Sequence, residues 1–136
     1  AGSVDGIEIQ AFDLDHIDNG FVEESKVVIF GSPTYCGTMS WQLKKYIDTI
    51  PIKLAGKMGC AYATENYIGG GADFAEISIV GCLLVRGMVV YSGGAAEAPY
   101  THFGAVTIKS GDELQVERVK KYTHKIIKMA KELFGE

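Results

Sequence analysis

Hydrophobic and polar positions along the chain predict several strands. Residues 7–12 alternate apolar and polar side chains, which is typical of a strand with one wet face. Residues 27–30 form a continuous apolar run, which predicts a strand buried on both faces, as in a parallel sheet. Residues 58–63 and 88–91 are two further strand candidates, and a short strand is expected at 105–108.

Helical patterns separate and follow these strands. Apolar residues recur at helical spacing over 41–50, and Trp41 is expected to pack this helix onto the sheet. A second helix, over 74–84, is apolar almost all round, so we expect it to be largely buried. The last helix shows apolar residues at steps of three and four over 119–133.

The start of the last helix carries its own signal. Ser110 and Glu113 have the spacing of a capping box, in which each side chain bonds to a backbone N–H of the other residue. Asp112 near the start and Lys128 and Lys131 near the end have the charges that the helix dipole favours. The sequence therefore predicts a helix that begins at about Ser110.

Strands that alternate with helices predict an α/β fold with a parallel sheet covered on both faces. Residues 1–136 show no linker or repeat and are expected to form a single domain. The first two strands, however, are joined by a segment that is short for a parallel crossover, since residues 16–25 leave room for only a turn of helix. We therefore expect another strand and helix to precede Ala1.

Composition and charge narrow the class of protein. Apolar residues make up 47% and charged residues 22%, as in ordinary folded proteins, and the net charge of −4 argues against a nucleic-acid partner. No apolar run reaches the roughly 18 residues of a membrane span. The three cysteines are odd in number and lie in apolar stretches, which favours a reducing, cytoplasmic location, and they are too scattered for a metal site.

Three loops follow the carboxyl ends of strands, where open parallel sheets bind their ligands. They span residues 31–39, 64–71 and 93–104, and each combines glycines with aromatic residues. Tyr35 and Tyr67 project from the first two and are suited to stack on both sides of a flat heteroaromatic ligand. Structural turns that bind nothing are the alternative, since surface loops are often rich in these residue types.

At these loops the chain resembles a known family. The run Gly-Ser-Pro-Thr-Tyr-Cys-Gly-Thr-Met-Ser at 31–40, followed by a helix, resembles the FMN loop of flavodoxin-like oxidoreductases, and in particular the WrbA-type NAD(P)H:quinone oxidoreductases. The glycines at 69–71, the segment Arg-Gly-Met-Val-Val at 86–90 and the segment Phe-Gly-Ala-Val-Thr-Ile at 103–108 resemble later segments of the same family, in the same order. The resemblance spans residues 6 to 134.

The resemblance implies a flavodoxin-like doubly wound parallel sheet of order 2-1-3-4-5, with FMN at the carboxyl ends of the strands. By this likeness the backbone around Cys36 would face the N5/O4 edge of the flavin, and Tyr35 and Tyr67 would flank its ring. The cofactor-binding residues implied in this way are Ser32, Pro33, Thr34, Tyr35, Cys36, Gly37, Thr38, Thr64, Glu65, Asn66, Tyr67, Gly69 and Gly70.

The chain departs from the family pattern in three places. Family members open with a strand and a phosphate-binding loop that this chain lacks, so the domain is expected to be N-terminally incomplete, starting near the end of the first helix. Cys36 and Thr38 stand where the family usually has Phe and Asn. Arg86 stands where WrbA-type proteins carry a histidine before Gly-Met.

The function implied by the resemblance is FMN-dependent electron transfer from NAD(P)H to a quinone or similar acceptor, in an enzyme that tends to form homo-oligomers. Flavin chemistry belongs to the cofactor, so no catalytic triad is expected and no metal is required. His102 is the candidate substrate residue, because a histidine can donate a proton to a reduced quinone near neutral pH. A loop histidine without a functional role is the alternative. The role of Cys36 has two alternatives as well, a redox-sensitive thiol or a packing group.

Two other functions stay open. A flavodoxin-type carrier would shuttle electrons to a redox protein instead of a quinone. A flavodoxin-like module without flavin would serve assembly or interaction. NAD(P)H-driven reduction of the flavin separates the enzyme from the carrier, and a visible spectrum identifies the colourless module.

Overall fold

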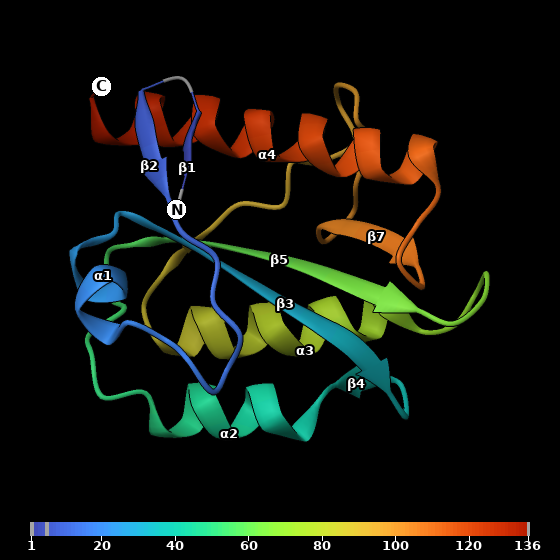
Figure 1. Cartoon of the computed structure of the whole chain (residues 1–136), viewed down its shortest axis with the longest axis horizontal. Helices are drawn as coiled ribbons and strands as arrows, with labels where there is room; N and C mark the ends of the chain where they lie inside the picture. The colour runs from blue at the N-terminus through green and yellow to red at the C-terminus, as the bar shows by residue number, and fades with distance from the viewer. Residues whose placement is uncertain (1, 5, 136) are drawn as a thin grey trace.

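The computed structural model describes residues 2–4 and 6–135, which form three layers (Figure 1). A twisted sheet lies in the middle, α4 (Glu113–Phe134) covers one face, and α2 (Trp41–Thr49) and α3 (Ala72–Val85) cover the other. A short helix, α1 (Asn19–Glu24), precedes the longest strand. The strands are β1 (Gly2–Val4), β2 (Ile7–Ile9), β3 (Val27–Tyr35), β4 (Thr38–Met39), β5 (Met58–Glu65), β6 (Val89–Val90) and β7 (Ala105–Ile108).

β5 is the centre of the main sheet. It pairs in parallel with β3 along seven residues of each strand, from Val27 opposite Met58 to Pro33 opposite Thr64. Its other edge pairs in parallel with β6 at its start and with β7 at its end. The two short strands therefore occupy one strand position, which the loop between them interrupts. The expected parallel α/β sheet is confirmed, and these three adjacent positions correspond to the 3-4-5 part of the expected order.

The N-terminal strand differs from the expectation. Residues 7–12 contain a strand only over Ile7–Ile9, and it pairs antiparallel with β1 in a separate two-stranded sheet. Gly6, with φ of +79°, lies in the turn between them. Antiparallel neighbours need only a short turn, whereas parallel ones need a long crossover. Polar–apolar alternation indicates one solvent-exposed face and does not identify the pairing partner. The prediction that residues 7–12 form a strand of the parallel sheet is therefore wrong.

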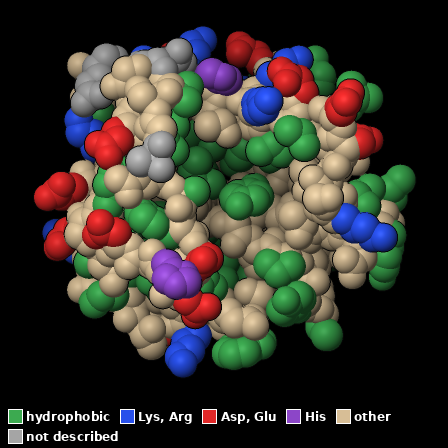
Figure 2. All heavy atoms as spheres, viewed as in Figure 1, with side chains coloured by type: hydrophobic (Ala, Val, Ile, Leu, Met, Phe, Trp, Pro, Cys, Tyr) green, Lys and Arg blue, Asp and Glu red, His purple; other side chains and the backbone are tan. Residues whose placement is uncertain are grey.

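The sheet is not equally covered on the side of α4. Ile29 of β3 and Tyr62 of β5 keep 39% and 40% of their surface exposed. In Figure 2 apolar side chains reach the surface near the middle of the view, where the sheet runs between the layers of α4 and α2. Among the described residues the other edge of β3 pairs only with β4, at its last two residues.

The two larger apolar cores among the described residues hold the layers together. One lies under α2 and α3, and the other lies between α4 and the sheet. In the second core Tyr122 of α4 is 1% exposed, and its hydroxyl donates to the carbonyl oxygen of Ala61 in β5 at 2.8 Å. Each buried side chain of this size stabilises the fold by roughly 1.5–3 kcal/mol. The first four residues of β5, Met58 to Ala61, are thus buried from both sides, as their apolar sequence requires.

The prediction that α3 is largely buried is wrong. Its inner residues pack on the sheet, but Phe74, Ile77, Leu84 and Val85 are 65%, 44%, 58% and 89% exposed. A helix on a sheet can bury only one side, so an all-round apolar sequence leaves apolar residues outside unless a second layer covers them. Trp41, expected to pack α2 onto the sheet, is likewise 67% exposed, and α2 is anchored by Leu43 and Ile47 instead.

The start of α4 also differs from the expected capping box. The N-cap is Asp112, whose side chain accepts from the backbone N–H of Gln115 at 2.8 Å. Lys109 and Gly111 have φ of +54° and +81°, so the chain turns before the helix begins and Ser110 lies outside it. The helix then runs for 22 residues with one buried face. Within residues 2–4 and 6–135 no helix is both long and apolar enough to cross a bilayer.

Candidate functional site

The carboxyl ends of β3 and β5 bring the first two predicted loops to one rim of the sheet. The strands remain paired to Pro33 and Thr64, the last bonded pair before both loops leave the sheet. The hydroxyl of Thr34 donates to the carbonyl oxygen of Thr64 at 2.8 Å, which ties the two loops together at their base. Both predicted loops therefore diverge from a shared, rigid edge.

The first loop is a tight hairpin between β3 and β4. Tyr35 pairs with Thr38, and Cys36 and Gly37 between them have φ of +48° and +77°. Two left-handed central residues are what a two-residue hairpin of matching twist requires, although a cysteine there costs roughly 1–2 kcal/mol. Cys36 and Gly37 are both exposed in this turn, and Tyr35 beside them is 46% exposed.

Ser32 supports this hairpin from below. It is 4% exposed, and its hydroxyl donates to the carbonyl oxygen of Pro33 at 2.7 Å and accepts from the backbone N–H of Ser40 at 2.8 Å. Ser40 is the N-cap of α2 and accepts from the backbone N–H of Leu43. Because its hydroxyl is engaged on both sides, the predicted contact residue Ser32 holds the turn onto the start of α2.

The second loop runs from Glu65 to Gly71 and leads into α3. The Glu65 carboxylate accepts from the backbone N–H of Ala72 at 3.0 Å, and its backbone oxygen accepts from the N–H of Lys109 at 2.7 Å. A carboxylate at a helix N-terminus satisfies an otherwise unpaired N–H and interacts favourably with the helix dipole. Glu65 therefore fixes the loop, while Tyr67 at its tip is 68% exposed.

The two loops meet at Gly71. A Cβ atom at this position would lie 3.3 Å from the Thr34 Cγ2 atom and 3.5 Å from the Gly37 Cα atom. Gly71 also has φ of +90°, a left-handed conformation that favours glycine. The close approach therefore sets Tyr35 and Tyr67 on adjacent loops, as the sequence predicted for a pair of rings about one ligand. Their role as ligand contacts stays a prediction.

A cavity of about 400 Å³ lies on the α3 side of the second loop. It joins Glu65 and Gly69 of that loop to His102 of the interrupted fifth strand position and to Arg118 of α4. Arg118 donates to the backbone oxygen of Tyr100 and so anchors the loop that carries His102. The structure thus brings the predicted substrate residue next to the second loop, with an exposed imidazole.

Sequence reasoning missed one buried carboxyl near this cavity. Glu76 of α3 is 0% exposed, and neither carboxylate oxygen has a hydrogen-bond partner among the described residues. Burial is the main cause that raises the pKa of Glu76 to about 9; the negative charges of Asp73 and Glu65 contribute to this rise, and the positive charge of Arg118 opposes it. Glu76 is therefore a neutral acid at pH 7. The available signal was a lone acidic residue on the inner face of an otherwise apolar helix.

A second cavity, of about 610 Å³, lies between α2 and α3 beside the first loop. Its walls include Tyr35, Met39 and Trp41 on one side and Ser78 and Cys82 of α3 on the other. The backbone N–H of Met39 donates to the Ser78 hydroxyl at 3.1 Å, which joins the hairpin to α3. The two cavities therefore flank the pair of tyrosine-bearing loops.

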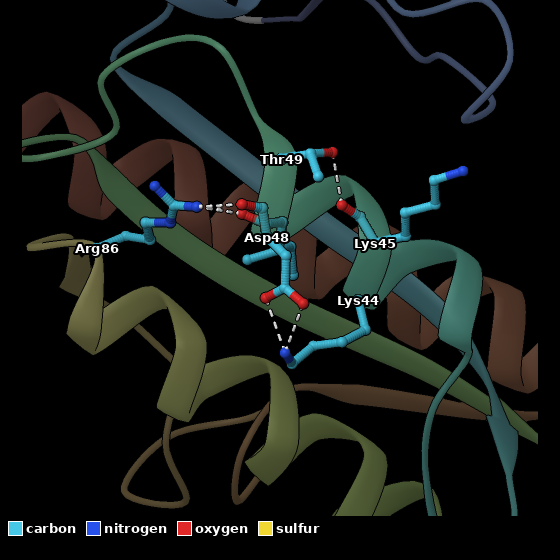
Figure 3. Close-up of polar contacts among 6 residues, drawn as sticks. Lys44, Lys45, Asp48, Thr49 and Arg86 are labelled. Carbon is cyan, nitrogen blue, oxygen red and sulfur yellow. Dashed lines mark hydrogen bonds and ion pairs between the residues drawn. The ribbon is translucent and has the colours of Figure 1, made fainter.

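Polar contacts fix the far end of this second cavity (Figure 3). Lys44 donates to both carboxylate oxygens of Asp48 at 2.7 and 2.8 Å, and this bond raises the pKa of Lys44. Arg86 reaches from the end of α3 and donates to the backbone oxygens of Ile47 and Asp48 at 2.5 and 3.1 Å. Arg86, which stands at the family's histidine position, therefore joins the ends of α2 and α3.

The rim has the chemistry for a flat heteroaromatic ring. Two exposed tyrosines provide stacking faces, and Gly37, Thr38 and Gly69 beside them are exposed as well. No group of three or more His, Cys, Asp or Glu side chains suited to a metal occurs within residues 2–4 and 6–135. The phosphate-binding loop expected upstream of Ala1 lies outside this sequence and stays a prediction.

Comparison with known proteins finds relatives among flavodoxins and NAD(P)H dehydrogenases (quinone). No family model matches it. A flavodoxin from Clostridium saccharobutylicum is 42% identical over 130 residues, which cover 94% of this chain and 81% of that protein. An NAD(P)H dehydrogenase (quinone) from Archaeoglobus fulgidus is 27% identical over 122 residues, which cover 82% of this chain and 63% of that protein. The chain thus spans less than two thirds of the second relative.

Two solved structures have the same architecture. A WrbA-like flavodoxin from Agrobacterium tumefaciens matches with a TM-score of 0.67 at 18% identity, covering 85% of this chain and 74% of that one. A Fusobacterium nucleatum flavodoxin bound to flavin mononucleotide matches with a TM-score of 0.64 at 16% identity, covering 81% and 75%. These identities show the flavodoxin-like fold alone, whereas 42% identity across nearly the whole chain shows the family. The chain belongs to the flavodoxin family.

Proposed function

We propose that this chain binds FMN at the rim formed by the β3–β4 hairpin and residues 65–71, and that it transfers electrons through this cofactor. The observation that carries the proposal is the contact of the two loops at Gly71, which sets the exposed rings of Tyr35 and Tyr67 on adjacent loops. Family membership supports it, since one structural relative is a flavodoxin bound to flavin mononucleotide. FMN, when bound, supplies a ring that accepts a hydride or single electrons.

The residues of the chain then hold and orient the ring. The exposed turn at Cys36 and Gly37 would face the polar edge of the ring, and Thr38 and Asn66 are exposed beside the two tyrosines. Ser32 and Glu65 would support the site without touching the ring, because their side chains hold the two loops in place. Loops that are already fixed before binding lose little freedom when the ring binds, which favours tight binding.

The finer proposal is that the chain is part of an NAD(P)H-dependent oxidoreductase that reduces a quinone or similar acceptor. The 400 Å³ cavity beside the second loop supports it, because it offers space for a second small molecule next to His102. Arg118 in the same cavity is a cation suited to an anionic or carbonyl group. The relative from Archaeoglobus fulgidus has a name of this kind.

The alternative is a carrier that exchanges electrons with redox proteins. The 42% identity to a flavodoxin favours it, and the two exposed tyrosines would then mark the edge offered to the partner. In a carrier the cavity at His102 has no task in the reaction. The two functions therefore differ in whether a nicotinamide nucleotide reduces the bound flavin directly.

FMN binding is tested by titrating the full native protein with FMN and following the quenching of flavin fluorescence. The double variant Tyr35→Ala/Tyr67→Ala is expected to weaken binding about 10- to 100-fold, since each stacked pair contributes about 0.5–1.5 kcal/mol. Leu114→Ala is the control, because Leu114 is 83% exposed on α4. An unchanged affinity in the double variant contradicts the site, and a native protein that stays colourless with FMN contradicts the function.

The enzyme and the carrier are separated by stopped-flow mixing of the FMN-loaded protein with NADPH and, separately, with NADH. Loss of flavin absorbance within seconds, followed by its return on adding a quinone, supports the oxidoreductase. His102→Asn is expected to slow only the second phase, because His102 is proposed to give a proton to the acceptor. Flavin that stays oxidised with both nucleotides supports the carrier.

A further inference from the structure

The cavity between α2 and α3 joins the proposed flavin rim to aromatic and basic side chains that the rim does not use. Its volume of about 610 Å³ falls within the roughly 300–1,000 Å³ of small-molecule sites. Its walls include Tyr35 of the hairpin and, from α2, Trp41, Lys44 and Lys45. The cavity is therefore large enough, and close enough to the rim, to hold part of a molecule that also reaches the flavin.

Trp41 offers this cavity an aromatic face that the fold does not use. It is the first residue of α2 and is 67% exposed, since Leu43 and Ile47 anchor the helix instead. Its ring has no aromatic partner among the described residues. An exposed indole beside a cavity is suited to stack on a flat heteroaromatic base, because stacking removes apolar surface of both rings from water.

Two lysines follow Trp41 on the next turn of α2. Lys44 is held by Asp48, with its ammonium 2.7 and 2.8 Å from the two carboxylate oxygens. Figure 3 shows the ammonium of Lys45 pointing away from this pair, and among the described residues it has no acceptor. Because residues three and four apart on a helix are neighbours, both cations lie near the indole. Two lysines against one carboxylate leave the described walls with a net positive charge.

The cavity at His102 has the opposite balance of charge. Its walls carry the carboxylates of Glu65 and Asp73 against the guanidinium of Arg118. Phosphate groups repel carboxylates and pair with cations, so they are disfavoured there and favoured between α2 and α3. The two cavities that flank the loops are therefore suited to different molecules, one to an anion that carries a flat base and the other to the carbonyl acceptor proposed above.

We propose that the cavity between α2 and α3 binds the adenosine diphosphate part of a nicotinamide nucleotide. The adenine ring stacks on Trp41, and the ammonium of Lys45 pairs with a phosphate group. The nicotinamide end then lies toward Tyr35, which is a wall of this cavity and a predicted flank of the flavin. This inference rests on the proposed oxidoreductase function and adds the place where the nucleotide binds, which leaves the cavity at His102 to the acceptor.

The site is tested without electron transfer by ¹⁹F NMR of the FMN-loaded full native protein labelled with 5-fluorotryptophan. Trp41 is the one tryptophan of this sequence, and the variant Trp41→Phe identifies its resonance. ADP is expected to shift this resonance in a saturable manner, whereas inorganic pyrophosphate, which lacks the base, should shift it much less. A resonance that ADP leaves unmoved overturns the proposal. A shift with ADP in a protein whose flavin NADPH leaves oxidised supports the nucleotide site and contradicts the oxidoreductase.

The phosphate contact is tested by the same titration on the variant Lys45→Ala. The Kd for ADP is expected to rise about fivefold, because a hydrogen bond from a cation to a phosphate is lost at an exposed position. Lys128→Ala is the matched control, since Lys128 is an exposed lysine of α4, on the opposite face of the sheet. A Kd that Lys45→Ala leaves unchanged, or that both variants raise equally, overturns the proposal.

The stacking contact is tested by the kinetics of flavin reduction. Trp41→Ala is expected to raise the KM for NADPH about 5- to 10-fold with an unchanged kcat, because the adenine is bound equally before and during hydride transfer. The KM for reduced nicotinamide mononucleotide, which lacks the adenylate, should not change, and Trp41→Phe should restore most of the affinity for NADPH. A variant Trp41→Ala that affects both donors equally indicates a structural role and overturns the proposal.

Discussion

Helices α3 and α4 cover opposite faces of one sheet, but their sequences serve different surroundings. α4 buries Tyr122 and Ile126 on one side and turns charged residues outward, so its apolar and charged positions match the surfaces that they face. α3 buries Ile79 and Leu83 but exposes apolar residues on the other side and hides a carboxyl, Glu76, underneath. The difference shows that a helix can keep an apolar outer face that no part of the described chain covers.

The largest expected effect is the loss of stability on truncating a buried residue of α4, compared with an exposed residue of α3. Tyr122→Ala should lower the free energy of unfolding by about 3–5 kcal/mol, since it opens a cavity and leaves the Ala61 carbonyl oxygen without its partner. Urea denaturation measures the loss. Leu84→Ala on α3 is the contrast and should change the free energy of unfolding by much less, because Leu84 is 58% exposed.

The buried carboxyl of α3 should make stability depend on pH. The pKa of Glu76 is raised from 4.5 to about 9 in the fold, so between these pH values unfolding releases a proton and stability falls as pH rises. Glu76→Gln removes this dependence and should stabilise the protein at pH 7 by ~1–3 kcal/mol. Chemical denaturation from pH 5 to 9 measures this pH dependence of the free energy of unfolding. A parallel pH profile for wild type and variant contradicts the assignment, and Glu117→Gln on the exposed side of α4 is the control.

The smallest of the three effects concerns the start of α4. Asp112→Ala should destabilise the fold by about 1 kcal/mol, because it removes the side chain that accepts from the Gln115 N–H. Ser110→Ala should have almost no effect, since Ser110 lies outside the helix. Thermal unfolding followed by circular dichroism at 222 nm compares them. The reverse order would restore the capping box that the sequence suggested.

Much of the candidate site was predictable from the sequence because it depends on local rules. A buried strand followed by Gly, Pro and Thr indicated the first loop, and a run of three glycines before a helix indicated the second. Their proximity followed from the parallel sheet, whose carboxyl ends meet at one edge. The engagement of Ser32 and Glu65 in supporting the loops was not predictable, because it depends on where Ser40 and Ala72 lie in space.

The sequence by itself determined the alternation of strands and helices, the two tyrosine-bearing loops and the amphipathic α4, because periodicity and turn chemistry act over a few residues. Only the tertiary structure decided that residues 7–9 form an antiparallel hairpin, that β6 and β7 share one strand position, and which side of α3 faces water. An apolar side chain records a preference for burial without naming the surface that will cover it. Packing between segments distant in sequence decides which surface covers it. No segment of the described chain covers the apolar outer face of α3.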